Sequence, residues 1–383
     1  KGSITILILL DLSAAFDTID HQVLLNRLTN TFGIIGKAHQ WLRSYLVGRS
    51  QAVSVTNSQS NPRELSYGVP QGSVLGPLLF VCYMQPLGDI ISKHGLQYHF
   101  YADDCQVYIS FNPHQEVATA IAQVEHCIKS ISEWMHNNFL KLNEDKTEFI
   151  VFGTKSKLKS VGTMNIKIGD NLLTATPTVK SLGVTFDSNM RMDSHISNIC
   201  RNIYYQIRNI SQIKDFLTPS ALRTIVQACI TSRLDYTNSL LYGLPSCAIS
   251  RLQKAQNAAA RLVTRTRKRD HIQPVLINLH WLPVQSRIEY KTLLLTYKAL
   301  NGMAPSYMAD LLTKYSPTRH LRSADATQLL VPRTHLKSWG DRTFPKASAS
   351  LWNNLPLVLR QSPSLTVFKR DLKTHLFRIA YAV

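Results

Sequence analysis

The stretch "LQYHFYADDCQVYIS", residues 96–110, contains two adjacent aspartates, Asp103 and Asp104, between two runs of strand-forming residues. A carboxylate in apolar surroundings is unfavourable unless a cation or hydrogen bonds compensate its charge. The stretch therefore indicates one of two arrangements: the acids bind a cation, or they lie at the tip of a hairpin that only looks apolar. In both cases we expect two strands that meet at the acids.

A second acid lies at the end of an apolar run. The segment "ITILILLDLSAAF", residues 4–16, predicts a buried strand that carries Asp11 at its C-terminal end. If this strand is a neighbour of the Asp103 strand, three carboxylates converge and could hold divalent cations. Oxygen ligands without His or Cys favour Mg²⁺ or Mn²⁺ over Zn²⁺. Two such ions about 4 Å apart clamp the reacting oxygens in phosphoryl transfer. Taken singly, each acid could equally be a solvated loop residue.

The remaining segments predict a mixed fold that becomes helical. Apolar spacing predicts helices in "DHQVLLNRLTNTFG", "HQWLRSYLVGR" and "QEVATAIAQVEHCIKSISEWMHNNF", and one that begins near Val74. The segments "QAVSVTN", "KTEFIVFG", "MNIKIGDNLL" and "VKSLGVTFD" predict strands and turns. Beyond about Met190 we expect helices over 193–215, 219–234, 248–265, 284–300, 305–314 and 364–379. The fold class is therefore α+β, with one boundary near residue 190 and a weaker one at 267–274.

Charge separates the two halves of the chain. Residues 1–190 contain 15 Lys and Arg and 15 Asp and Glu, so their charges balance. Residues 191–383 contain 28 Lys and Arg but only 9 Asp and Glu, so the second half carries the whole net charge of +19. Such an asymmetry predicts a polyanionic partner, with a merely solvated basic surface as the alternative.

The six cysteines form no CxxC pair, which argues against a zinc module and a disulfide framework and favours an intracellular setting. No signal peptide is expected, because the apolar run near the N-terminus ends in an acid rather than in a small-residue cleavage site. No membrane partner is expected either, because the longest apolar stretch, 74–84, is too short to span a bilayer. The chain starts without Met inside an apparent strand, which predicts a fragment.

Three motifs in order resemble a known family. "FYADD" (100–104) resembles the Tyr-x-Asp-Asp signature of reverse transcriptases, "LDLSAAFDTIDH" (10–21) is similar to their first palm motif, and "YGVPQGSVLGPLLF" (67–80) is similar to the motif between them. Together they most resemble the polymerase of non-LTR (LINE-type) retrotransposons, and residues 279–312 resemble the region downstream of it. The resemblance implies an RNA-directed DNA polymerase that extends a DNA primer on an RNA template, using deoxynucleoside triphosphates and two Mg²⁺ or Mn²⁺ ions. It also implies a palm with largely missing fingers at 1–190, a helical thumb at 191–267 and a basic, mainly helical C-terminal region at 268–383.

The resemblance assigns roles to individual residues. It implies that Asp11 and Asp103 are the principal metal ligands and catalytic acids, with Asp104 assisting. Asp17 and Asp20 fall outside the ligand pattern, and we interpret Asp17 as a structural or helix N-terminal residue. Phe16 would exclude ribonucleotides by colliding with a 2′-hydroxyl, with a core role as the alternative. The resemblance also implies that Gln71 and Gly72 face the nucleotide and the template, and that Lys146 protonates the pyrophosphate that leaves. The hairpin 179–187 resembles the one that grips the end of the primer.

The basic second half fits a region that contacts a template–primer duplex through its phosphates. Its densest run, "RLVTRTRKR", contains Arg261, Arg265, Arg267, Lys268 and Arg269, which could bind nucleic acid or form a solvated helix end. The tryptophans Trp281, Trp339 and Trp352 could stack on bases, although core positions are favoured for them.

Two other functions stay open. An RNA-dependent RNA polymerase also has paired palm acids, but the aromatic Phe16 argues against ribonucleotides. A catalytically inactive, element-derived fragment could still bind nucleic acid. For either polymerase function we expect a nuclear and cytoplasmic location.

Overall fold

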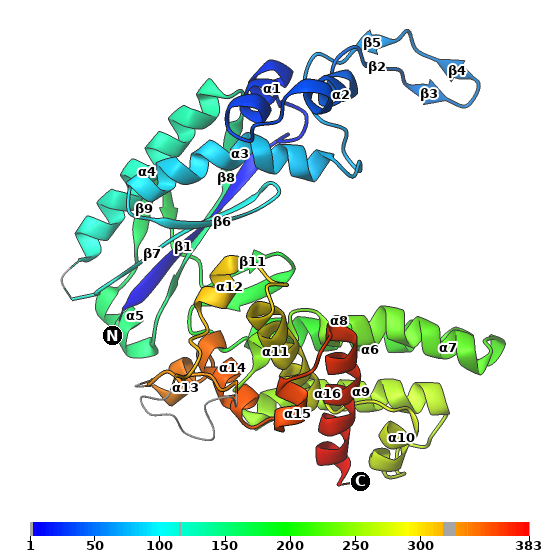
Figure 1. Ribbon diagram of the computed structural model, residues 1–383. Helices are drawn as coiled ribbons and strands as arrows, with labels where there is room; N and C mark the ends of the chain where they lie inside the picture. The colour runs from blue at the N-terminus through cyan, green and yellow to red at the C-terminus, as the bar shows by residue number, and fades with distance from the viewer. Residues whose placement is uncertain (1–2, 115, 317–326, 335, 383) are drawn as a thin grey trace. The chain divides into compact units, whose positions relative to one another are not determined.

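The computed structural model describes residues 3–114, 116–316, 327–334 and 336–382. The chain divides into two compact units, Lys1–Met190 and Arg191–Val383 (Figure 1). Each unit has its own hydrophobic core.

A four-stranded antiparallel sheet is the centre of the first unit. Its strands are β1 (Ile4–Ser13), β6 (Gln97–Tyr101), β7 (Asp104–Phe111) and β8 (Lys141–Phe152), in the order β6-β7-β1-β8. Strand β1 pairs with β7 on one side and with β8 on the other. The predicted neighbourhood of the Asp11 and Asp103–Asp104 strands is therefore confirmed.

Helices cover one face of this sheet. Along β1 the side chains of Ile4, Ile6 and Ile8 are fully buried, and the residues between them are half-buried. The continuous apolar run predicted a wholly buried strand, but β1 is fully buried on one face only. The helices α3 (Gly76–Lys93) and α4 (Val117–Asn137) pack on that face, because their buried residues share its core. The other face carries apolar side chains, such as Leu7 and the buried Ile150, together with polar ones such as Gln106 and Glu148.

Shorter elements surround the sheet. Helix α1 (His21–Asn30) is capped by Asp20, whose carboxylate accepts a 2.8 Å hydrogen bond from the backbone N–H of Val23. The strands of a projecting arm, drawn at the upper right of Figure 1, are β2 (Ser50–Gln51), β3 (Ser54–Val55), β4 (Ser58–Gln59) and β5 (Arg63–Glu64). The other elements are α2 (Gly36–Leu46), α5 (Lys155–Val161), and the hairpins β9 (Asn165–Ile168) with β10 (Asn171–Thr174) and β11 (Thr178–Ser181) with β12 (Val184–Asp187).

The second unit is helical in its described residues, apart from an isolated bridge between Lys314 and Leu329. Its longer helices are α6 (Asp193–Ile213), α7 (Pro219–Val226), α9 (Ser246–Thr264), α11 (Val284–Leu300), α14 (Phe344–Asn353) and α16 (Leu365–Tyr381). Its shorter ones are η1 (Lys214–Phe216), η2 (Gln227–Thr231), α8 (Ser232–Asp235), η3 (Asn238–Leu241), α10 (Ile272–Asn278), α12 (Ser306–Asp310), α13 (Lys337–Gly340) and α15 (Leu357–Arg360). The predicted α+β class, an antiparallel sheet backed by helices and followed by a helical part, is confirmed.

Two details of the second unit differ from the sequence-based expectation. The segment 219–234, expected as one helix, contains the five-residue π-helical turn η2 between α7 and α8. Helices α10 and α14 were not predicted. Trp352 lies in the core, where Phe368 stacks on Tyr297 with ring centroids 4.3 Å apart, so its predicted core role is confirmed.

Candidate active site

The two adjacent acids lie where the strands β6 and β7 meet. Tyr101 pairs with Asp104, which leaves Ala102 and Asp103 as a two-residue turn. Ala102 has a φ of +53°, a conformation that such turns require and that normally selects Gly or Asn. An alanine held there indicates backbone strain at the turn, as is often found at functional sites. The turn is the predicted hairpin tip.

Asp104 and Asp11 share a cavity. Leu10 pairs with Cys105, and both side chains are buried among the helices. Successive side chains of a strand point to opposite faces, so Asp11, which follows Leu10, and Asp104, which precedes Cys105, lie on the other face of the sheet. There the two acids line a cavity of about 110 Å³. Asp103 is exposed in the turn and does not line this cavity.

The charge of this acidic group is poorly compensated. Burial, and then the neighbouring carboxylates of Asp103 and Asp11, raise the pKa of Asp104. The Nζ atom of Lys146 lies 4.0 Å from Oδ2 of Asp11, but the two side chains are 72% and 44% exposed, so their attraction is weak. Carboxylate oxygens of this kind suit Mg²⁺ or Mn²⁺. Within the described residues, however, no three His, Cys, Asp or Glu side chains are arranged as a metal site.

Strand β8 bulges beside Asp11, in the segment that contains Lys146. Leu9 pairs with Glu148 and Asp11 with Asn143, so the residues between them on β8 bulge out of the ladder. The hydroxyl of Thr147 donates a 2.8 Å hydrogen bond to the carbonyl of Asn143 and supports the bulge. If the register of Leu9 and Glu148 continued, Lys146 would lie opposite Asp11. The bulge moves the pairing of Asp11 to Asn143 and leaves Lys146 in the bulged segment, where its Nζ atom is still 4.0 Å from Asp11.

Four further polar residues line the same cavity: Gln106, Glu148, Lys180 and Ser181. Lys180 and Ser181 belong to the hairpin 179–187 that resembles a primer grip, whereas Gln106 and Glu148 were not singled out from the sequence. The Nε2 group of Gln106 donates a 2.7 Å hydrogen bond to the hydroxyl of Ser181. This bond attaches the β11–β12 hairpin to the open face of β7. Strand alternation is the signal that could have found Gln106, two residues after Asp104.

Phe16 lies against the core rather than free in a pocket. Its ring centroid is 4.9 Å from that of Phe80 on α3, and its side chain is half-buried. Its carbonyl accepts a 2.8 Å hydrogen bond from the backbone N–H of Val69. Gly68 has a φ of +88°, and a Cβ there would lie 3.0 Å from the carbonyl oxygen of Asp17. The segments around Phe16 and Val69 are therefore packed backbone to backbone.

Gln71 and Gly72 lie in the adjoining loop. The side-chain amide of Gln71 donates to both carboxylate oxygens of Asp17, at 3.2 and 3.3 Å. Gly72 has a φ of +77°. Asp17 is thus a structural partner of the loop, and the helix N-cap is Asp20 instead.

The basic run of the second unit is partly used in local contacts. Arg261 donates to the carbonyls of Arg267 and Asp270, and Arg265 forms an ion pair with Asp215 at 3.2 Å. Arg267, Lys268 and Arg269 are exposed beyond the end of α9. Of the five residues, these three are the most accessible to a ligand.

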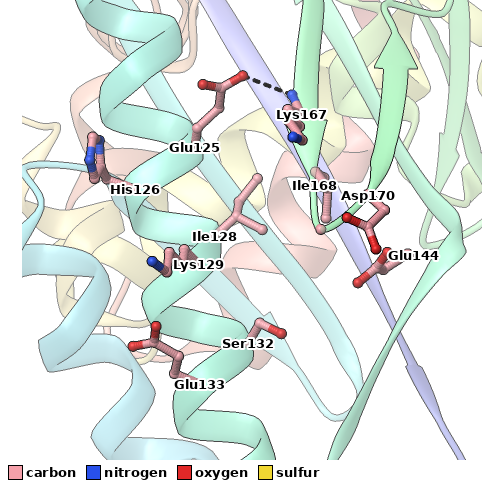
Figure 2. Close-up of a pocket in the computed structure, with 11 residues that line it drawn as sticks. Glu125, His126, Ile128, Lys129, Ser132, Glu133, Glu144, Lys167, Ile168 and Asp170 are labelled. Carbon is pink, nitrogen blue, oxygen red and sulfur yellow. Dashed lines mark hydrogen bonds between the residues drawn. The ribbon is translucent and has the colours of Figure 1, made fainter.

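A larger cavity, of about 510 Å³, lies between α4 and the β9–β10 turn. Figure 2 shows Ile128 and Ile168 within it, surrounded by side chains of both charge signs such as Lys129, Glu133 and Asp170. The carboxylate of Glu125 accepts a 2.8 Å hydrogen bond from the backbone N–H of Lys167 at its wall. None of the predicted site residues lines it, so the candidate active site is the smaller, acidic cavity.

The first unit matches a known family. Residues 1–186 match the reverse transcriptases, described as RNA-dependent DNA polymerases. Residues 1–186 belong to the reverse transcriptase family. The sequence-based resemblance is thereby confirmed, and Asp11, Asp103 and Asp104 all lie within the reverse transcriptase domain.

Relatives of the chain come from mobile elements of the non-LTR type, as the resemblance predicted. The chain is 29% identical over 271 residues to the probable RNA-directed DNA polymerase from transposon BS of Drosophila melanogaster, a match that covers 67% of the chain and 28% of the relative. It is 27% identical over 267 residues to the probable RNA-directed DNA polymerase from transposon X-element of the same organism, with the same coverage of both. The chain thus spans under a third of these relatives' length.

Among solved structures, the chain is similar to telomerase from Candida albicans in complex with a fragment of telomeric RNA. The sequence identity is 12% and the TM-score 0.36, and the match covers 72% of this chain and 47% of the other. No helix in the described part of the chain is long and apolar enough to cross a membrane.

Proposed function

We propose that this chain is part of the RNA-directed DNA polymerase of a non-LTR retrotransposon and extends a DNA primer on an RNA template. One observation carries the proposal: Asp11 and Asp104, on paired strands of a reverse transcriptase domain, face a common cavity beside the Asp103 turn. In this proposal residues 1–190 act as the palm, 191–267 as the thumb and 268–383 as a basic C-terminal region.

The metal ions of the reaction would bind to Asp11, Asp103 and Asp104. Burial, and then the carboxylates of Asp103 and Asp11, raise the pKa of Asp104, and a divalent cation would neutralise the charge that these three acids share. Two Mg²⁺ or Mn²⁺ ions would supply Lewis-acid chemistry at the primer 3′-hydroxyl and the triphosphate. The protein's own task is then to hold these carboxylates and the substrates in position.

The residues around the acids would position the deoxynucleotide. Phe16, supported from behind by Phe80, would form the floor under the sugar. Gln71 and Gly72 would lie beside the base and template. Lys146, at the rim of the acidic cavity, would give a proton to the pyrophosphate that leaves.

The partners would be an RNA template with a DNA primer and deoxynucleoside triphosphates. The excess of 28 Lys and Arg over 9 Asp and Glu in residues 191–383 supports contacts to phosphates, with Arg261, Arg265, Arg267, Lys268 and Arg269 as candidates. A retrotransposon polymerase of this kind would act inside the cell, in the nucleus and cytoplasm.

Primer extension tests the proposal. The purified chain, given an RNA template, a DNA primer, Mg²⁺ and deoxynucleoside triphosphates, should extend the primer. Asp11→Asn and Asp103→Asn should each abolish extension while template binding on filters is retained. Asp170→Asn, which removes an exposed acid in the β9–β10 turn, is the matched control and should keep full activity.

The same assay separates the other functions. Template binding without extension, in this chain and in one to which a fingers region has been added, would identify an inactive nucleic-acid-binding fragment. Incorporation of ribonucleotides in preference to deoxynucleotides would identify an RNA polymerase.

A further inference from the structure

The helical unit contains a polar cavity that the polymerase reaction does not use. It has a volume of about 340 Å³ and lies among the π-turn η2, α8, η3, α11 and α16. This volume is within the range of small-molecule sites. The lining residues that matter here are Asn238, Trp281, Arg287, Tyr290, Lys291 and Lys373.

A buried, unpaired acceptor lines this cavity. The side chain of Asn238 is 2% exposed, and its Oδ1 atom has no hydrogen-bond partner. Buried polar atoms are almost always paired, and leaving one unpaired is costly. An oxygen in this position calls for a donor from outside the protein, such as an N–H or O–H group of a ligand.

The wall beside Asn238 has an unusual backbone. Gln227 and Thr231, the two ends of the π-turn η2, both line the cavity. Single π-turns within α-helices occur frequently at functional sites. Here the turn interrupts the run from α7 to α8 next to the unpaired oxygen, which is a second and independent sign of a ligand site.

The charges of the cavity favour an anion. The Nη1 group of Arg287 donates to both carboxylate oxygens of Asp235, at 2.9 and 2.8 Å, so these two charges offset each other. Lys291 and Lys373 remain, and within the described part of the chain neither forms an ion pair with an acid. The cavity therefore has two surplus positive charges near a neutral acceptor.

A neighbouring cavity extends this site. It has a volume of about 410 Å³, shares His280 and Lys373 with the first cavity, and adds Arg370, Arg378 and the ring of Phe377. Trp281 and Tyr290 provide aromatic surface in the first cavity. Lysines, arginines and aromatic rings along one groove are the features that bind single-stranded nucleic acids.

We propose that this cavity binds one unpaired nucleotide of a single-stranded nucleic acid. Its phosphate would contact Lys291 and Lys373, its base would contact Trp281 or Tyr290, and an N–H or O–H group would donate to Asn238. The strand would continue over the neighbouring cavity. This site is separate from the acidic cavity of the polymerase, so either proposal can fail without the other.

Tryptophan fluorescence of the full chain tests the site. A short single-stranded oligoribonucleotide should quench the emission at saturation, AMP should do so more weakly, and Trp281→Phe should remove the quench. Lys291→Met and Lys373→Met should each weaken binding about tenfold, as removal of a charged group predicts. Lys369→Met, on the same helix as Lys373 but outside both cavities, is the matched control and should bind normally.

Asn238→Leu separates a binding role from a structural one. If Oδ1 serves a ligand, this variant should bind the oligoribonucleotide about tenfold more weakly while its melting temperature is unchanged or higher, because an unpaired polar atom is removed. A lower melting temperature with unchanged binding would overturn the proposal. Inorganic phosphate that competes as well as AMP, or equal effects of the Lys369 and Lys373 variants, would overturn it too.

Discussion

At the scale of single residues, the packing of Phe16 can be separated from the role proposed for it in nucleotide selection. Its ring packs on Phe80, and it would also exclude a 2′-hydroxyl. Phe16→Val should reduce the preference for deoxynucleotides over ribonucleotides by about tenfold or more, since a steric contact of this size is worth a factor of that order. The measurement is kcat/KM for both nucleotides in primer extension.

The control for this prediction is Phe80→Leu. This change disturbs the same ring pair from the core side, so it should lower the melting temperature without changing the nucleotide preference. If both variants shift the preference equally, Phe16 is a core residue and the predicted contact with the sugar is wrong.

Lys146 offers a second prediction at this scale. Because its ion pair with Asp11 is long and exposed, Lys146→Met should leave the melting temperature nearly unchanged. If Lys146 protonates the leaving group, kcat should fall by about 10²-fold or more. Lys141→Met, an exposed change on the same strand, should have no effect on kcat. Equal rates in the two variants would contradict the assignment.

At the scale of elements, β7 and α4 each contribute a buried free thiol to the core that they share. Cys105 on β7 and Cys127 on α4 are 2% and 0% exposed, and burial raises the pKa of Cys127 to about 12. Because the thiolate is the reactive form, a raised pKa keeps this thiol protonated and unreactive up to pH 9.0, where an ordinary thiol is half ionised.

Alkylation followed by mass spectrometry checks this packing. In the native chain the exposed Cys247 should react with iodoacetamide within minutes, and Cys105 and Cys127 should react only after urea is added. Rapid native labelling of Cys127 would mean that α4 does not cover the sheet as described.

Elements with a strong local pattern could be predicted from the sequence, and elements defined by packing could not. The strands on both sides of Asp103 alternate and end in a turn, so the hairpin was expected. Helix α14, "FPKASASLWN", is rich in Ala and Ser and begins beside a proline, and it has too few large apolar residues to show a period. The π-turn η2 has no local signature and depends on its surroundings.

The same reasoning applies to the site. The acids were evident because a carboxylate beside a buried strand is unusual in any sequence. Glu148 and Lys180 were not, because the side of the sheet that they face depends on the pairing of β8 with β1 and on the docking of the β11–β12 hairpin. Register and hairpin docking are tertiary properties, and no short motif reports them.

At the scale of the whole molecule, the excess basic charge of residues 191–383 predicts salt-sensitive binding to an RNA–DNA duplex. Replacing Arg267, Lys268 and Arg269 by alanine should weaken binding and reduce the slope of log K against log salt concentration by about 1 for each phosphate that the variant no longer neutralises.

The matched control is a triple alanine variant of Lys155, Lys157 and Lys159, which removes the same charge from the neutral first unit. Its slope should be unchanged, because direct pairing with phosphates rather than net charge determines the slope. Equal slopes in both triple variants would show that the basic run at the end of α9 is only a solvated surface.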